Sequence, residues 1–205
     1  MTRKFLEEAY ALDGVEGAKA LYEGWAASYD AEIQENGYVT PRRCAEALAG
    51  LTDDLSAPVL DLGCGTGLSG LALRAAGFTT VDGLDISPAM LALSRARDGV
   101  YRSLGQVNPD QAIPAQGGDY AHVVAAGVIS PDHAPAGTIN EILDLLPSGG
   151  CLVFSLNDHA LEDPSFPAKL AEVVEQGRAS LEFKEYGDHL PGIGLSAWVY
   201  GLRKT

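Results

Sequence analysis

With 205 residues, of which 46% are hydrophobic and 20% charged, the chain has the composition of one ordinary globular domain. Its formal net charge of −14 disfavours a nucleic-acid substrate, because an acidic surface repels phosphate groups. No apolar run approaches the roughly 18 residues of a membrane span. Cys44, Cys64 and Cys151 are widely separated and odd in number, which indicates reduced thiols. We therefore expect a cytoplasmic protein without a membrane or nucleic-acid partner; nothing in the sequence specifies an oligomeric state.

The first 55 residues predict helices without strands, over Gly17–Tyr29 and Thr40–Leu48. This region carries the aromatic side chains Tyr22, Trp25, Tyr29 and Tyr38. Packing at the edge of a sheet is the common fate of such residues, whereas a lid over a ligand pocket is the functional alternative. The two are compatible, so we expect residues 1–55 to form a helical lid or cap and residues 56–205 a sheet core, within a single domain.

From Ala57 onward, strand-like and helix-like stretches alternate, which is typical of a parallel sheet with helices on both faces. The predicted strands are Val59–Leu62, Thr79–Leu84, Tyr101–Leu104, Tyr120–Ala125, Cys151–Leu156, Ser180–Tyr186 and Ser196–Leu202. The predicted helices are Leu68–Ala76, Pro88–Arg97, Thr138–Leu146 and Phe166–Gln176. Gly187–Gly194 is too short for a crossover helix, so the last two strands should pair antiparallel. We expect an α/β fold with a doubly wound, mostly parallel, seven-stranded sheet and an antiparallel C-terminal hairpin.

The segment Asp61–Gly67, with the sequence Asp-Leu-Gly-Cys-Gly-Thr-Gly, joins the first strand to its helix. Glycines at alternate positions of such a turn let bare backbone approach a nucleotide-like ligand. Asp85 follows the next strand, at about the spacing of a ribose-binding acid. Because Gly65–Gly70 also matches the dinucleotide fingerprint G-x-G-x-x-G, an NAD(P)-dependent oxidoreductase is an alternative. Two observations argue against it: Asp61 is placed to suit a ligand with an ammonium group, and no Tyr-x-x-x-Lys pair lies on a predicted helix.

These segments resemble the ordered motifs of class I S-adenosylmethionine-dependent methyltransferases, and the resemblance implies a Rossmann-like fold. The matching segments are Asp61–Gly67 for the first motif, Asp85–Leu91 for the second, Gly118–Val124 for the fourth strand and Leu146–Gly150 for the turn before the fifth strand. They cover nearly the whole chain in the right order. In addition, Tyr22–Asp30 and Leu190–Gly194 are similar to the small methyltransferase-like proteins named for the Williams–Beuren region.

The resemblance implies roles toward the cofactor, S-adenosyl-L-methionine. Asp85 would accept the ribose hydroxyls, and Ile86 and Met90 would flank the adenine. Asn108 stands where the family often has an acid that bonds the adenine amino group, so this contact departs from the family pattern. The methionine part would be held by Asp61, Gly63, Cys64, Gly65, Thr66 and Gly67. The rest of the pocket would be lined by Ala126, Gly127, Val128, Tyr22, Trp25 and Tyr29.

Methyl transfer from a sulfonium requires an aligned acceptor, and an alcohol or a protonated amine also requires a base. His133, which follows the fourth predicted strand beside Asp132, is the candidate base, with a solvated loop residue as the alternative reading. Tyr29 is the second candidate catalytic residue, and it or Tyr22 would contact the sulfonium by cation–π attraction. His122 lies in mid-strand, and we expect it to be structural.

No metal site is expected, because His159 and His189 have no carboxylate at metal-ligand spacing. The N-x-P-P-[YF] sequence of many nucleic-acid amino methylases is missing after the fourth strand, where Gly127–Ser130 stands. We therefore predict methyl transfer from S-adenosylmethionine to a small-molecule acceptor. The alternatives are the NAD(P)-dependent oxidoreductase and a non-catalytic cofactor-binding protein on the same scaffold.

Overall fold

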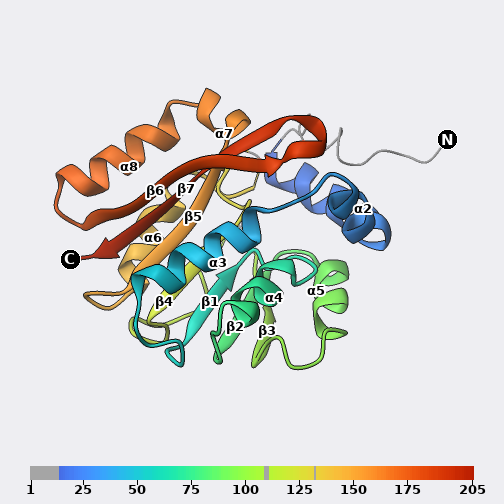
Figure 1. The fold of residues 1–205 in the computed structure, drawn as a ribbon, viewed down its shortest axis with the longest axis horizontal. Coiled ribbons are helices and arrows are strands. Elements are labelled where there is room, and N and C mark those ends of the chain that lie inside the picture. Colours follow the sequence, from blue (N-terminus) through green and yellow to red (C-terminus); the bar gives the residue numbers. More distant parts are fainter. Residues whose placement is uncertain (1–13, 109–110, 132) are drawn as a thin grey trace.

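The structure, a computed structural model, describes residues 14–108, 111–131 and 133–205. Its sheet has seven strands in the order β3-β2-β1-β4-β5-β7-β6 (Figure 1). The strands are β1 Val59–Leu62, β2 Val81–Asp85, β3 Ser103–Gln106, β4 His122–Ala125, β5 Cys151–Asn157, β6 Ala179–Leu190 and β7 Leu195–Lys204. The helices are α2 Gly14–Glu35, α3 Thr40–Leu51, α4 Leu68–Ala75, α5 Pro88–Arg95, α6 Thr138–Leu145, α7 Asp158–Glu162 and α8 Ser165–Glu175, with a 3-10 turn, η1, at Pro191–Ile193. None of the helices in these ranges is long and apolar enough to cross a membrane.

The direction of each strand follows from its connection. The strands β1 to β5 pair in parallel, whereas β7 pairs antiparallel with both β5 and β6. Only η1 and Gly194 separate β6 from β7, which is too short for a parallel crossover. The strand order reverses between β1 and β4, and ligands of such sheets bind beyond the carboxyl ends of the strands at that point. The expected Rossmann-like, mostly parallel sheet with an antiparallel terminal hairpin is confirmed.

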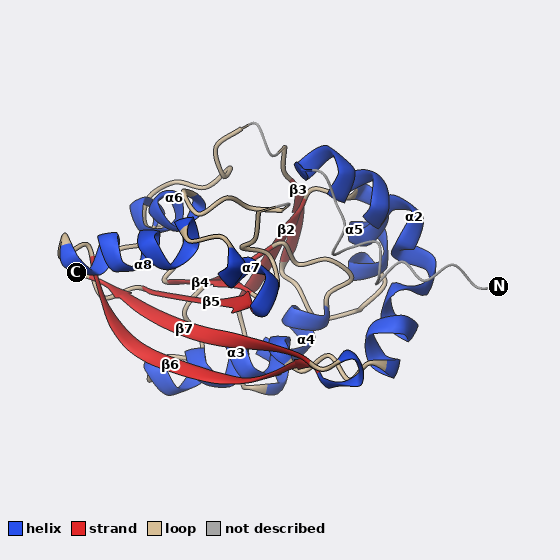
Figure 2. Cartoon of the chain, turned by 90° about the horizontal axis from the view of Figure 1, so that it is seen from above, coloured by secondary structure: helices blue, strands red, loops and turns tan. Residues whose placement is uncertain are grey.

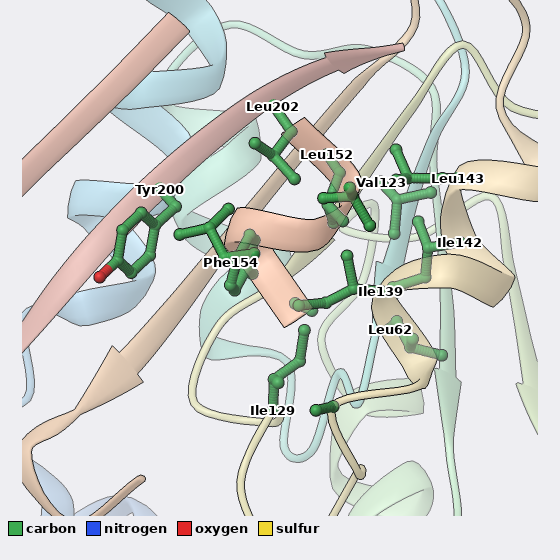
Figure 3. Close-up of a cluster of buried hydrophobic side chains, with 14 of the residues drawn as sticks. Leu62, Val123, Ile129, Ile139, Ile142, Leu143, Leu152, Phe154, Tyr200 and Leu202 are labelled. Carbon is green, nitrogen blue, oxygen red and sulfur yellow. The ribbon is translucent and has the colours of Figure 1, made fainter. Parts of the chain in front are cut away.

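Helices cover both faces of the sheet (Figure 2). On one face, α6 and α8 close a core in which Ile139 packs with Leu152 and Phe154 (Figure 3). On the other face, α3 and α4 bury Leu48 and Leu73. Every residue of β1 and β4 is buried, so these strands are nearly continuous apolar runs, as expected for parallel strands covered on both sides. Burial of each large aliphatic side chain contributes about 1.5–3 kcal/mol.

The helix α2 packs against both the β6–β7 hairpin and the helix α5. Leu21, Trp25 and Ile33 pack on Leu190 and Leu195 of the β6–β7 hairpin in a third apolar cluster. The same helix also contacts α5, and the two helices lie side by side in both views (Figures 1 and 2). Residues 14–35 therefore bridge the hairpin and the cofactor-motif helices.

Several predicted boundaries are wrong, because pairing with neighbouring strands rather than the local apolar run sets where a strand ends. The affected segments are the second strand, which is Val81–Asp85 rather than Thr79–Leu84, the third, which is Ser103–Gln106 rather than Tyr101–Leu104, and the expected loop Gly187–Gly194, whose first half belongs to β6. The helix α2 continues to Glu35, past the predicted end at Tyr29, and α7 was not predicted. The division into a lid over residues 1–55 and a core over 56–205 stays a prediction, and residues 1–13 lie outside the described residues.

Candidate functional site

The turn between β1 and α4 depends on glycine. Gly63, Gly65 and Gly67 have φ of +70°, +53° and +93°, a region that side chains with a Cβ rarely adopt. A Cβ on Gly63 would lie 2.3 Å from Cγ2 of Val128, whereas a Cβ on Gly65 would meet nothing within 4 Å. The backbone amide of Gly63 donates to the carbonyl of Leu84 at 2.7 Å, which fastens the turn to β2. The turn therefore brings backbone close to Val128 and leaves open space above Gly65.

Asp85 ends β2 directly beside this turn. Its Oδ2 accepts from the amide of Gly65 and its Oδ1 from the amide of Ser87, both at 2.8 Å. The side chain is buried, and burial raises the pKa of its carboxyl even though these amides oppose the shift. Ser87 caps α5, as predicted, by accepting from the amide of Met90. Asp85 is thus a fixed acceptor whose oxygens can also accept hydrogen bonds from the hydroxyls of a ribose.

Asp61 lies under the turn and is completely buried. Its Oδ2 accepts from the hydroxyls of Ser69 at 2.5 Å and Tyr101 at 2.7 Å. Its Oδ1 has no hydrogen-bond partner among the described residues. Burial, partly offset by these two hydroxyls, raises the pKa of Asp61 to about 6. A buried carboxylate oxygen without a donor suits a ligand that brings an ammonium group.

A cavity of about 660 Å³ opens beyond the carboxyl ends of β1, β2 and β4. The predicted cofactor-site residues in its wall are Tyr22, Tyr29, Gly63, Gly65, Asp85, Ile86, Met90, Asn108, Ala126, Gly127 and Val128. Wall residues that the sequence did not single out for this cavity are Tyr38, Leu62, Val107, Gln111, Ile113, Ala134, Pro135, Thr138 and Glu141. The motif residues and the chain after β4 thus meet around one cavity.

Other predicted cofactor residues lie outside that wall: Trp25, Asp61, Cys64, Thr66 and Gly67. In the turn, the residues between the glycines direct their side chains away from the cavity. Cys64 is buried against Gly83 of β2, and burial raises the pKa of its thiol. The hydroxyl of Thr66 donates to Oδ1 of Asp30 at 2.6 Å. A glycine motif therefore predicts where the backbone comes close to a ligand. It predicts little about where the side chains between the glycines lie.

Polar contacts hold α2 against the motif. Asp30 accepts from Thr66 and also forms an ion pair with Arg97, whose Nε donates to the carbonyl of Thr66 at 2.6 Å. About two turns earlier in α2, Glu23 accepts from the hydroxyl of Ser87 at 3.3 Å. These contacts place the aromatic face of α2 over the cavity.

That aromatic face is a packed cluster. The rings of Tyr22 and Trp25 stack at 5.7 Å, and Trp25 meets Tyr29 edge-on at 4.7 Å. Tyr22 and Tyr29 line the cofactor cavity, whereas Trp25 is 1% exposed and lines a neighbouring chamber. These aromatics therefore pack against one another, and two of them also line the cavity; their action as a lid stays a prediction.

His133 lies between two hydroxyl groups. Its Nε2 is 2.9 Å from the hydroxyl of Tyr22 and its Nδ1 is 2.7 Å from Oγ of Ser130. Hydroxyls donate or accept, so either tautomer of the ring satisfies both contacts. Asp132, its neighbour in the sequence, lies outside the described residues. The imidazole is nonetheless tied to α2 and positioned at the cavity wall.

A second, smaller chamber of about 110 Å³ adjoins the cavity. Residues that line both spaces, and so form the partition between them, are Tyr22, Tyr29, Tyr38, Gly127 and His133. The chamber alone is lined by Trp25, Ile33, Ile129, Ser130, Pro131, Ser155, Asn157, His159, Ala160, His189 and Leu190. Ser155 and Asn157 went unnoticed, since they end an apolar strand and match no motif.

The remaining histidines have different surroundings. His122 accepts from the amide of Cys151 at 3.2 Å, and burial lowers its pKa, which agrees with the structural role expected for it. His189 lies 2.7 Å from the hydroxyl of Thr40, and burial, followed by the charge of Arg43, lowers its pKa to about 4. Among the residues described, no group of His, Cys, Asp and Glu could hold a metal ion.

The sequence matches the family model described as a methyltransferase domain over residues 34–194. The human methyltransferase-like protein 27 is 33% identical over 149 residues, which are 69% of this chain and 59% of that protein, so the chain matches little more than half of its relative's length. The magnesium protoporphyrin IX methyltransferase of Synechocystis, solved with bound S-adenosylmethionine, is 17% identical with a TM-score of 0.63, over 84% of each chain. A methyltransferase of Thermotoga maritima, described as a possible histamine N-methyltransferase, is 15% identical with a TM-score of 0.64, over 91% of this chain and 98% of its own.

The chain belongs to this methyltransferase domain family, and the cofactor that the family implies is S-adenosylmethionine. The residues present fit that cofactor: the buried Oδ1 of Asp61 lacks a donor, Gly65 leaves open space, and Asp85 is a fixed acceptor in the wall. The family match gives no support to the NAD(P)-dependent alternative.

Proposed function

We propose that the protein transfers a methyl group from S-adenosylmethionine to a small molecule that enters the chamber beside the cofactor cavity. The observation that carries the proposal is the partition itself, since Tyr22, Tyr29 and His133 line both spaces. A chamber of about 110 Å³ suits a small acceptor or the reactive end of a larger one. The net charge of −14 also argues against a nucleic-acid acceptor.

S-adenosylmethionine supplies a methyl group activated by its sulfonium, which leaves the chain to bind, align and dehydrate the reactants. We assign the ribose hydroxyls to Asp85 and the ammonium of the methionine part to Asp61. Ile86 and Met90, both in the cavity wall, would flank the adenine. The side-chain amide of Asn108, in the same wall, has an oxygen that can accept from the adenine amino group.

His133 is assigned the role of general base. Its ring is held at both nitrogens, by Tyr22 and Ser130, at the boundary where an acceptor from the chamber would meet the cofactor. A neutral imidazole in this setting has one nitrogen that can take up the acceptor's proton. Tyr29 lines both spaces, and we assign its ring the role of excluding water and contacting the sulfonium.

The same proposal also covers the domain organisation, the cellular location and the subgroup of the protein. The chain would be a single domain in which residues 14–55 act as a lid, supported by the ties of Asp30 and Glu23 to the motif. A cytoplasmic location is supported by Cys44, Cys64 and Cys151, all of them buried free thiols. Membership of the group named for the Williams–Beuren region is in keeping with the human methyltransferase-like relative.

The test is conversion of S-adenosylmethionine to S-adenosylhomocysteine by the purified protein with a panel of small metabolites, and with RNA and protein substrates as comparison. We expect turnover with a member of the small-molecule panel alone. For that acceptor, His133→Gln should lower kcat by about 10²–10⁴-fold if its oxygen or nitrogen must lose a proton. Ser130→Ala is the milder control, because the ring keeps its contact with Tyr22. Turnover confined to RNA or protein would overturn the proposal.

A further inference from the structure

The chamber beside the cofactor cavity has an unusual lining for so acidic a protein. Among its described lining residues there is no Asp, Glu, Lys or Arg, although the chain has a net charge of −14. Its polar groups come from serine, asparagine, tyrosine and histidine side chains. Any charged ligand would therefore lose its hydration in the chamber without meeting an opposite charge of these residues, which is costly. The neutral hydrogen-bonding groups of the lining then decide which charge is tolerated.

The side chains at the end of β5 can offer this chamber hydrogen-bond donors. Oδ1 of Asn157 caps α7 by accepting from the amide of Ala160 at 2.9 Å, which fixes the amide orientation and leaves Nδ2 for a ligand. Oγ of Ser155 accepts from the amide of Gly127 at 2.8 Å, so its proton is directed elsewhere. Donors of this kind match a ligand oxygen that carries lone pairs or negative charge.

His189 adds no charge to the chamber. Its ring lies 2.7 Å from the hydroxyl of Thr40, and burial, followed by the charge of Arg43, lowers its pKa to about 4. It is therefore neutral near pH 7. His159 lies at the exposed side, 3.9 Å from Oε1 of Glu162. The interior of the chamber thus combines neutral donors with no fixed charge, a setting in which preorganised dipoles stabilise an oxyanion.

Another part of the lining is aromatic. Tyr22 and Trp25 stack at 5.7 Å with an interplanar angle of 14°, and Tyr29 closes the edge of Trp25 at 4.7 Å. All of these rings line the chamber, together with the side chain of Ile33. Stacked or edge-on contact with such rings favours a planar ring in the ligand over a flexible aliphatic chain.

We propose that this chamber binds a small aromatic acid, a planar ring that bears an ionisable oxygen, with Asn157 and Ser155 donating hydrogen bonds to that oxygen group. That this acid is the methyl acceptor rests on the proposed function, whereas its binding in the chamber does not.

The test compares probes of equal size and different charge: benzoate, benzamide and benzylamine. Each is titrated into the protein saturated with S-adenosylhomocysteine, and into the free protein, with ligand-observed NMR and calorimetry as the readouts. We expect benzoate to bind tightest and benzylamine weakest. Asn157→Asp keeps the oxygen that caps α7 and replaces the donor by a carboxylate, so it should weaken benzoate binding by about tenfold or more and favour benzylamine. Asn140→Asp makes the same change on α6, where the side chain bonds Arg178, and should leave all three affinities unchanged.

Benzylamine bound more tightly than benzoate by the unaltered protein would overturn the proposal. So would unchanged benzoate binding in a folded Asn157→Asp variant, or no detectable binding of any probe. Failure of the proposed function has a different signature, because benzoate would then bind and respond to Asn157→Asp while no small acceptor supports turnover of S-adenosylmethionine.

Discussion

The cofactor end and the acceptor end of this site are built from different kinds of contact. At the cofactor end, one stretch of chain from Asp61 to Met90 supplies backbone, glycine turns and two buried carboxylates. At the acceptor end, side chains from α2, the loop after β4, the end of β5 and the end of β6 meet around a small chamber. Hydrogen bonds between the ends of β1 and β2 hold the first, while the second forms where elements far apart in the sequence pack together and bond, as Tyr22 does with His133.

This difference indicates which part of the site can vary in sequence and which part cannot. A backbone turn that approaches Val128 closely accepts few side chains, so the cofactor end admits little variation. The chamber assigned to the acceptor is shaped mainly by side chains, which can differ without a change in the backbone turn that holds the cofactor. A scaffold of this design keeps its cofactor while its acceptor changes, and the following variants test that division.

The largest effect is expected at Gly63. Gly63→Ala places a Cβ 2.3 Å from Cγ2 of Val128 at a φ of +70°, so the turn must shift. We expect calorimetry to show no measurable binding of S-adenosylmethionine and a lowered melting temperature. In Gly63→Ala/Val128→Ala, the clash is relieved and part of the binding should return. Gly50→Ala on α3, where a Cβ meets nothing within 4 Å, is the control and should be neutral or stabilising. Normal cofactor affinity in Gly63→Ala would refute the close approach of backbone and Val128.

Asp85 should come next. Asp85→Ala removes the acceptor assigned to the ribose hydroxyls and should weaken cofactor binding by about 1.5–3 kcal/mol, the scale of hydrogen bonds to a charged group. Asp85→Asn keeps an oxygen for only one of the amides of Gly65 and Ser87 and turns its Nδ2 donor toward the other, so it should also weaken cofactor binding. Titration calorimetry measures both, with circular dichroism as the check on folding. If the folded Ala variant binds as tightly as the parent, the ribose assignment is wrong.

A smaller effect is expected from pH, through Asp61. Because its pKa is raised from 3.8 to about 6, the fold disfavours the ionised form, so this group's contribution to the free energy of unfolding falls as pH rises from 3.8 to about 6. Cofactor binding has the opposite dependence, since the ammonium needs the carboxylate. Affinity should therefore drop about tenfold for each pH unit below 6. In Asp61→Asn this part of the pH dependence should disappear; if it persists unchanged, another group is responsible.

The smallest effect is expected at the tie between α2 and the turn. The side chains of Asp30 and Arg97 are 44% and 24% exposed, so their ion pair should stabilise the fold by no more than about 0.2–1 kcal/mol. Asp30→Asn should therefore change the melting temperature little while speeding the release of S-adenosylhomocysteine in stopped-flow measurements. Arg42→Gln, which removes an exposed pair with Glu46, is the matched control and should leave release unchanged. Equal release rates in both variants would show that α2 is not a lid.

The contrast between the two ends also explains what sequence could predict. Asp61, the glycines and Asp85 are local in sequence and tied to strand ends, so their positions followed from the order of strands. Asn157 and Ser155 carry no local signal, because their meeting with α2 depends on how the β6–β7 hairpin packs on Trp25. For the same reason Trp25 was assigned to the cofactor, while its ring lines the chamber. The start of β3 at Ser103 was not predicted, because pairing with β2 determines where that strand begins.

The most direct test of this account is a crystal structure of the protein with S-adenosylhomocysteine. We predict ribose hydroxyls within hydrogen-bond distance of Asp85, the amino group beside Asp61, and the sulfur facing the partition formed by Tyr22, Tyr29 and His133. The chamber toward Asn157 should remain open for an acceptor. A cofactor whose sulfur points away from this partition, or whose adenine fills the chamber, would contradict it.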